Sequence, residues 1–201
     1  MRVATEIDVP IAALELHELE VRPPLADFDA EVASTEAAAR AGRVADPGPA
    51  RALYRRFGVD PTRYRPSSEA LLRRVGRGDP LPRVNSLVDV ANVVSLRLQV
   101  PVGLYDLARV EGDLRVRLGR EGEEYAGIGK ERVGVAGRIC VADAGGPCGN
   151  PSADSARTMI TTVTERAAWI FFLPVAEQDL RWTYELVAGY GRGLVRLVEA
   201  A

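Results

Sequence analysis

The chain contains very little histidine, lysine or cysteine. Among its 201 residues there are one histidine, His17, one lysine, Lys130, and two cysteines. A lone histidine excludes metal centres built from several histidines, and two cysteines are too few for a disulfide scaffold. Every basic residue except Lys130 is an arginine, a bias typical of a GC-rich genome. We therefore expect no metal site.

Long apolar runs are also missing. No stretch approaches the roughly 20 apolar residues that a membrane helix requires. The first ten residues, MRVATEIDVP, lack the basic and apolar regions of a secretory signal. Apolar residues make up 47% of the chain, and 26 basic residues nearly balance 28 acidic ones, so the chain can bury a core and is not disordered. We expect a soluble, cytoplasmic protein without membrane contact.

The glycine-rich nucleotide motifs are incomplete. The segment 127–131, GIGKE, is similar to the end of a phosphate-binding loop. The first glycine of that motif would fall at Glu124, however, and Glu131 replaces the Ser or Thr that ligates magnesium. The sequence predicts no cofactor.

Charge is distributed unevenly along the chain. Residues 1–36 carry nine acidic residues and two arginines, whereas residues 40–83 carry eleven arginines and four acidic residues. A basic segment of this kind favours an anionic partner such as RNA. The candidate RNA-binding residues are Arg55, Arg56, Arg73 and Arg74. The alternative is a solvated arginine-rich face that pairs with the acidic N-terminal segment.

The order of expected elements predicts an α+β fold. We expect a strand in 11–21, a helix in 25–41 and short helices at 50–57 and 67–75, with Ser67 or Ser68 as the N-cap of the last. Short strands separated by glycine turns follow at 114–118, 123–128, 138–143, 158–163 and 168–173. The stretch 176–201 is amphipathic and predicts a helix.

Segment 84–110 combines polar residues with an apolar background. Asn85, Asp89 and Asn92 recur at spacings of four and three, so a helix would place them on one face. The residues between them are almost all apolar, which predicts burial. Buried amides and carboxylates without partners cost about 1–3 kcal/mol each, so we expect a polar network or the floor of a pocket. A turn at 101–106 would bring Asp106 close to these three residues.

The same segment and its continuation match a known pattern. The order is an Asn, a Val-Asp pair, a second Asn, a Pro, an aromatic-Asp pair, a Gly and an Arg; these are Asn85, Val88-Asp89, Asn92, Pro101, Tyr105-Asp106, Gly112 and Arg117. Three later segments also match, at 121–123, 138–143 and 162–164. The chain resembles, over about residues 50–172, the tRNA-editing domain of the phenylalanyl-tRNA synthetase β subunit, known as the B3/B4 domain. Freestanding members of that family are similar to it in length.

The resemblance implies a fold and a partner. The fold would be α+β, a mixed and antiparallel β-sandwich of unusual topology with flanking helices. Residues 1–201 would form one domain, with a strand and helix extension at 1–49, the family core at 50–172 and a C-terminal helix at 176–201. In the synthetase the domain hydrolyses tyrosine wrongly esterified to the phenylalanine tRNA. The implied partners are tRNA or aminoacyl-tRNA, and a free amino acid or related small molecule.

Two positions depart from the editing relatives. They carry a His where this chain has Gly103, and a Glu where it has Ala156, with Asp154 as the nearest acidic substitute. We expect a cleft between the 101–106 turn and residues 145–164, wider at Gly103. The catalytic candidates are Asp154 and Thr164. The substrate-binding candidates are Gly103, Tyr105, Asp106, Arg157 and Thr158.

Three hypotheses follow from these observations. The first is a protein that binds tRNA or aminoacyl-tRNA, including a stand-alone proofreading hydrolase of aminoacyl esters. The second is a non-catalytic module that keeps the pocket for an amino acid or small ligand. The third is an interaction domain whose polar network only fixes the fold.

Overall fold

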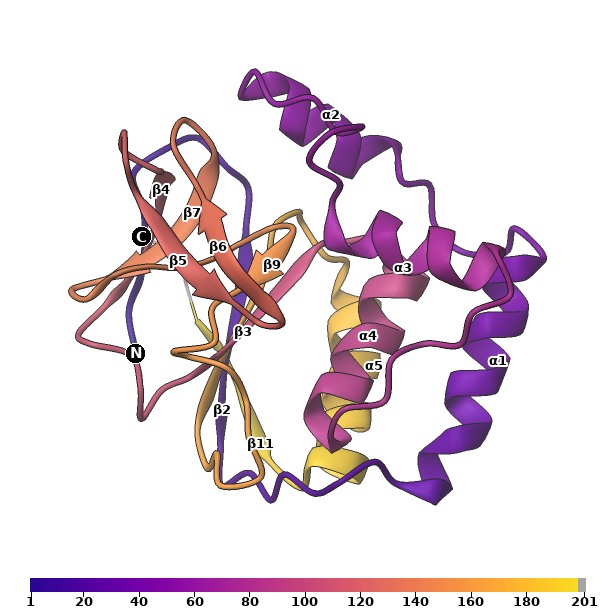
Figure 1. The fold of residues 1–201 in the computed structure, drawn as a ribbon. Helices are drawn as coiled ribbons and strands as arrows, with labels where there is room; N and C mark the ends of the chain where they lie inside the picture. The colour runs from indigo at the N-terminus through magenta and orange to yellow at the C-terminus, as the bar shows by residue number, and fades with distance from the viewer. Residues whose placement is uncertain (199–201) are drawn as a thin grey trace.

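A computed structural model describes residues 1–198 and places strands on one side of the molecule and most helices on the other (Figure 1). The helices are α1 (Asp29–Arg40), α2 (Gly48–Arg56), α3 (Ser67–Gly76), α4 (Ser86–Leu98) and α5 (Glu177–Leu186), with single turns η1 (Ala26–Phe28) and η2 (Val187–Gly191). The strands are β1 (Val3–Thr5), β2 (Ala12–His17), β3 (Val102–Asp106), β4 (Leu114–Leu118), β5 (Glu124–Gly127), β6 (Lys130–Gly134), β7 (Ile139–Asp143), β8 (Gly146–Asn150), β9 (Ala153–Asp154), β10 (Ala167–Phe171) and β11 (Leu194–Val198). The expected α+β class is confirmed.

The strands form two packed sheets and a separate hairpin. One sheet has the order β1-β4-β7-β8-β9 and the other the order β11-β2-β10-β3, while β5 and β6 pair with each other. Only β1 and β4 run parallel; every other pair between these strands is antiparallel. None of the helices in residues 1–198 is long and apolar enough to cross a membrane.

Strand β10 shows how the layers are held together. Its register places Trp169 and Phe171 on the face that packs against the helices, and Ala168 and Ile170 on the face between the sheets. All four are fully buried. Because both faces are covered, the strand reads as a continuous apolar run rather than an alternation.

Helix α4 lies at the centre of the helical layer, where it packs against α1, α3 and α5. Its N-cap is Asn85, whose side chain accepts a hydrogen bond from the Val88 N–H at 3.0 Å. The helix ends at Leu98 because Gln99 adopts a left-handed conformation with φ 52°. The periodicity of 84–98 therefore predicted this helix correctly.

Four expectations about local structure are wrong. The segment 101–106 is not a turn: residues 102–106 form strand β3 and pair along their whole length with β10. Residues 158–163 form a loop, since Thr158 accepts a backbone bond from Asp106 and the turn closes between Thr161 and Thr164. The N-cap of α3 is Pro66, and no side-chain capping bond is made by Ser67 or Ser68.

The fourth correction concerns the C-terminal segment. Helix α5 ends at Leu186, and after η2 the chain turns into β11, which pairs with β2. Gly193 lies so close to Leu19 that a Cβ would come within 2.5 Å of its Cδ2. The chain therefore leaves the helix and runs antiparallel beside β2 in the same sheet. Residues 199–201 of the expected helix lie outside the described residues.

Candidate functional site

A cavity of about 360 Å³ lies between the helical layer and the strands. Helices α3 and α4 form one wall, and β3, the tip of the β5–β6 hairpin and residues 152–160 form the other. Its wall is mainly apolar: Ala70, Leu71, Val84, Val88, Ala91, Val102, Leu104, Ile128, Ala153, Met159 and Ile160, with Ser67, Asn92, Ser95, Ser152 and Asp154 as the polar residues. Pockets of this size and character receive small organic groups. Both segments from which a cleft was expected, 101–106 and 145–164, contribute residues to one wall of the cavity, but the opposite wall is formed by α3 and α4.

Strand β3 presents only one of its faces to the cavity. Val102 and Leu104 line it, whereas Tyr105 lies in the apolar cluster between the sheets. A Cβ on Gly103 would come within 2.3 Å of the Tyr105 hydroxyl oxygen, so the ring of Tyr105 occupies the space that the glycine leaves. The expectation of a wider pocket at Gly103 is therefore wrong.

Among residues 1–198, Asp154 is the only acidic residue in the cavity wall. One carboxyl oxygen, Oδ2, accepts a hydrogen bond from the Leu104 N–H at 3.1 Å, which joins β9 to the edge of β3. Although Asp154 as a residue is half-buried, its other oxygen, Oδ1, is closed to solvent and has no hydrogen-bond partner in residues 1–198. Burial raises the pKa of Asp154 to about 7. Its carboxyl group therefore changes charge near neutral pH.

The hydroxyl of Tyr105 also lies at this carboxyl group. A Cβ on Gly149 would come within 2.5 Å of the Tyr105 hydroxyl and 2.9 Å of Asp154 Oδ1, so both atoms pack against this glycine. Burial, and after it the nearby Asp154 carboxylate, raises the pKa of Tyr105 well above its usual value. The tyrosine therefore stays neutral beside Asp154.

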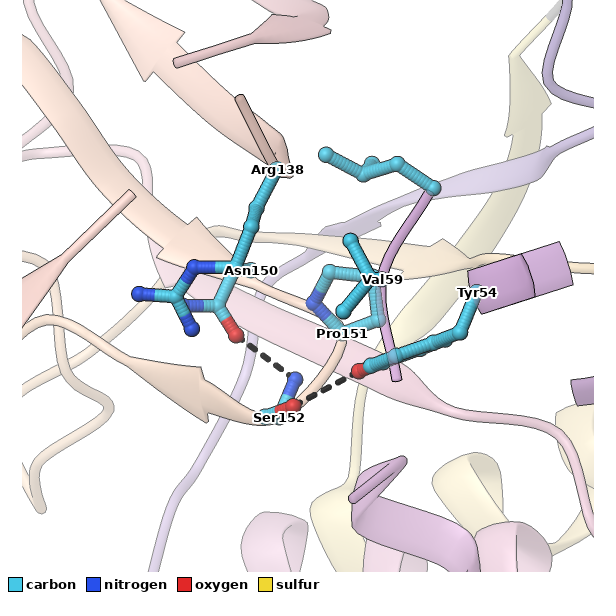
Figure 2. Close-up of a pocket in the computed structure, with 7 residues that line it drawn as sticks. Tyr54, Val59, Arg138, Asn150, Pro151 and Ser152 are labelled. Carbon is cyan, nitrogen blue, oxygen red and sulfur yellow. Dashed lines mark hydrogen bonds between the residues drawn. The ribbon is translucent and has the colours of Figure 1, made fainter. Parts of the chain in front are cut away.

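The segment beside the cavity is held by the hydrogen bonds in Figure 2. The Ser152 hydroxyl lies 2.6 Å from the Tyr54 hydroxyl, and the Ser152 N–H donates to Asn150 Oδ1 at 2.7 Å. On its other side, Asn150 Nδ2 donates to the Tyr125 hydroxyl at 2.7 Å. These bonds connect α2, β5 and the β8–β9 turn, and fix the position of Ser152 at the cavity.

A basic groove of about 510 Å³ adjoins the cavity, with Ala70, Ser152 and Ala153 common to both. Its charged residues are Arg63, Arg65, Lys130, Arg132 and Arg138, and Tyr64 lies among them. The Arg138 guanidinium is 4.1 Å from the centre of the Tyr64 ring, and that of Arg63 is 5.2 Å from it. Glu124 pairs with Arg132 at 2.6 Å and Glu69 with Arg65 at 3.4 Å. In the described part of the chain, no carboxylate oxygen lies within 4.0 Å of the charged side-chain nitrogens of Arg63, Lys130 or Arg138.

The sequence profile of the B3/4 domain matches residues 49–173, more than half of the chain. The chain belongs to the B3/4 domain family. This confirms the resemblance found in the sequence, and the boundaries agree closely with the expected range of about 50–172.

Similar proteins to this B3/4 chain include phenylalanine–tRNA ligase β subunits. That of Paramagnetospirillum magneticum is 40% identical over 65 residues, 32% of this chain and 8% of the relative. That of Bartonella quintana is 38% identical over 58 residues, 29% and 7% of the two chains. Each match therefore spans less than a tenth of the relative's length. Among solved structures, an N-terminal fragment of the phenylalanyl-tRNA synthetase β subunit from Pyrococcus horikoshii has a TM-score of 0.45 at 14% identity, over 58% of this chain and 43% of that one.

The four polar residues expected together in the B3/4 chain form two groups. Asn85, Asp89 and Asn92 lie at the start of α4: Asp89 accepts bonds from Arg83 and from the Val84 N–H, both at 2.7 Å. Asn92 is half-buried and lines the cavity. Asp106 instead lies at the end of β3, where it accepts a bond from Thr164 at 2.8 Å. Three of the four are almost fully buried, as expected.

Several expected substrate-binding and catalytic residues do not line the cavity. Thr164 Oγ1 donates to Asp106 and accepts from the Thr161 N–H at 3.0 Å, so it closes a turn. Arg157 makes a two-bond pair with Asp143 at 2.7 and 2.9 Å. Thr158 is fully buried, with its hydroxyl 3.4 Å from the Cys148 carbonyl oxygen that accepts its bond. Together with Gly103, Tyr105 and Asp106, these residues support the fold around the cavity; of the candidates, Asp154 alone lies in its wall.

The four expected RNA-binding arginines lie outside both the cavity and the groove. Arg55 and Arg56 are on α2, where Arg56 pairs with Asp8, and Arg73 and Arg74 are on α3, where Arg74 donates to the Pro80 carbonyl. The groove arginines at 63 and 65 do belong to the basic segment. Lys130, Arg132 and Arg138 are distant in sequence, and only the fold of the β5–β6 hairpin brings them to the same groove.

Proposed function

We propose that this B3/4 chain binds the aminoacylated 3′ end of a tRNA, with the amino-acid side chain in the cavity. The observation that carries the proposal is that the two spaces adjoin and share three lining residues. A mainly apolar cavity, suited to a side chain, meets a basic groove, suited to phosphates, at Ala70, Ser152 and Ala153. An amino acid esterified to RNA has this combination of an apolar group next to an anionic chain.

The kinship of the chain supports the same proposal. The relatives named above are β subunits of phenylalanine–tRNA ligases, and these names connect them with a tRNA and an amino acid. The matched part is a small fraction of those proteins, so the synthetase reaction itself is not transferred to this chain.

Hydrolysis of the aminoacyl ester, as a stand-alone proofreading step, is the second candidate. It is favoured by the pKa of Asp154, about 7, since a general base that activates water works best when its pKa is near the operating pH. Against it, Oδ1 is closed to solvent, and the editing relatives' His and Glu positions are Gly103 and Ala156 here. Binding without catalysis therefore remains the primary proposal.

A panel of correctly charged, mischarged and uncharged tRNAs tests both candidates. Binding is measured by filter retention, and loss of the ester by release of labelled amino acid. Val88→Trp, which fills the cavity wall on α4, should weaken binding of charged tRNA about tenfold and leave uncharged tRNA unaffected. The matched control is Val163→Trp, at a residue that is 76% exposed and away from the cavity. Equal affinity for charged and uncharged tRNA, unaffected by Val88→Trp, would refute the proposal.

A further inference from the structure

The groove beside the cavity has a strongly basic lining. Its five basic residues come from two separate parts of the chain, Arg63 and Arg65 before α3, and Lys130, Arg132 and Arg138 on and after β6. No acidic residue in the described part of the chain lines it. Three of these cations lack an acidic partner within 4.0 Å in residues 1–198. Because like charges on facing walls repel, a ligand with several negative charges would stabilise this arrangement.

The groove also offers planar surfaces. Tyr64 is half-buried and lines the groove, and the guanidinium groups of Arg63 and Arg138 lie over its ring. Aromatic rings and guanidinium planes are the surfaces on which unpaired nucleobases stack in proteins that bind single-stranded RNA. A ligand with both phosphates and unpaired bases therefore fits better than an inorganic anion.

The groove adjoins the cavity, and this determines which part of a ligand the groove would contact. Ala70, Ser152 and Ala153 form the border with the cavity, and the Tyr54–Ser152–Asn150 hydrogen bonds hold that border in place (Figure 2). A group in the groove would therefore lie next to a group in the cavity, with these three residues between them.

We propose that the groove formed by Arg63, Tyr64, Lys130 and Arg138 binds the sugar-phosphate backbone of the unpaired 3′ nucleotides of RNA, next to the ester whose amino acid enters the cavity. The inference rests on the proposed function and adds the RNA-contacting surface to it. It places the contact in the groove and away from the exposed arginines of α2 and α3.

Two triple variants of equal charge change test this assignment. The groove variant combines Arg63→Gln, Lys130→Gln and Arg138→Gln. The control combines Arg43→Gln, Arg55→Gln and Arg73→Gln, three exposed residues without an acidic partner within 4.0 Å in residues 1–198. The ligand is a fluorescently labelled single-stranded RNA ending in CCA, without an amino acid, titrated at several salt concentrations. Thermal melting confirms that both variants are folded. If the groove triple is not folded, the double variant Arg63→Gln, Lys130→Gln replaces it, because it leaves the contact of Arg138 with Tyr64 in place.

The groove variant should bind this RNA at least tenfold more weakly at low salt. Its plot of log affinity against log salt should be flatter by about two, since each phosphate contact on a single strand contributes about 0.7 to the slope. The control should retain the parent's affinity and slope. Equal losses in both variants, or a loss in the control alone, would overturn the groove assignment while the proposed function stands. If the parent protein binds neither this RNA nor charged tRNA, the groove assignment and the proposed function both fail.

Discussion

Replacing Asp154 by Asn should change how the stability of the protein depends on pH. Burial raises the pKa of this carboxyl from 3.8 to about 7. The folded protein therefore holds a proton that the unfolded chain has released between these two pH values. The contribution of Asp154 to stability is thus complete below pH 4 and is lost as the pH rises through about 7. A shift of three pKa units corresponds to a change of about 4 kcal/mol at most in the free energy of unfolding.

Asn keeps an oxygen that accepts the Leu104 N–H bond but carries no charge. Urea denaturation from pH 4 to pH 8 measures the free energy of unfolding for both proteins. The Asn variant should gain on the parent as the pH rises, by up to about 4 kcal/mol over this range. Asp143→Asn is a control for which the opposite pH dependence is expected. Despite the burial of Asp143, the hydrogen bonds from Arg157 and from the Glu111 and Gly145 amides lower the pKa of its carboxyl group. The free energy of unfolding of that variant should therefore fall furthest below that of the parent at neutral pH. A difference between parent and Asp154→Asn that is constant with pH, or that moves the other way, would refute this reasoning.

Two other substitutions test the packing and the polar contacts near the cavity. Gly103→His should destabilise the fold by about 1–3 kcal/mol, because a Cβ there would lie 2.3 Å from the Tyr105 hydroxyl. Adding Tyr105→Ala should recover part of that loss in urea denaturation, and a loss that is simply additive would contradict the contact. Asp89→Ala should lower the melting temperature through a loss of about 1–3 kcal/mol, since it leaves the Val84 N–H and the Nε–H of Arg83 without their acceptor. Asn92→Ala should destabilise the protein less than Asp89→Ala, because Asn92 is half-buried and makes one long hydrogen bond of 3.3 Å to the Pro82 carbonyl. A loss of stability at Asn92 that equals or exceeds the loss at Asp89 would contradict this account.

Local signals in the sequence predicted much of the fold. The spacing of Asn85, Asp89 and Asn92 predicted the helix α4, and β4 has the boundaries expected for it. Strand β3 was missed because Pro101 and Gly103 are typical of turns. In the structure a side chain at position 103 would collide with the ring of Tyr105, which lies two residues further on the same face of the strand. Strand β11 was missed because it depends on a contact with β2, far away in the sequence. Such pairings are tertiary and leave no local pattern.

The candidate site was less accessible to prediction for the same reason. The sequence indicated Asp154 and the two segments that contribute to one wall of the cavity. It could not show that Thr164 closes a turn or that Arg157 is paired with Asp143. The groove was missed because Lys130 and Arg138 join Arg63 only in the folded chain. Charge density along the sequence therefore pointed to α2 and α3, whose arginines lie outside the groove.

The most direct test of the central claim is the affinity of the unmodified protein for one tRNA in its charged and uncharged forms. The cavity should receive the amino acid, so the charged form should bind at least tenfold more tightly, and Val88→Trp should abolish the difference while Val163→Trp preserves it. Equal affinities for the two forms in the parent protein would contradict the claim that the cavity binds the esterified amino acid.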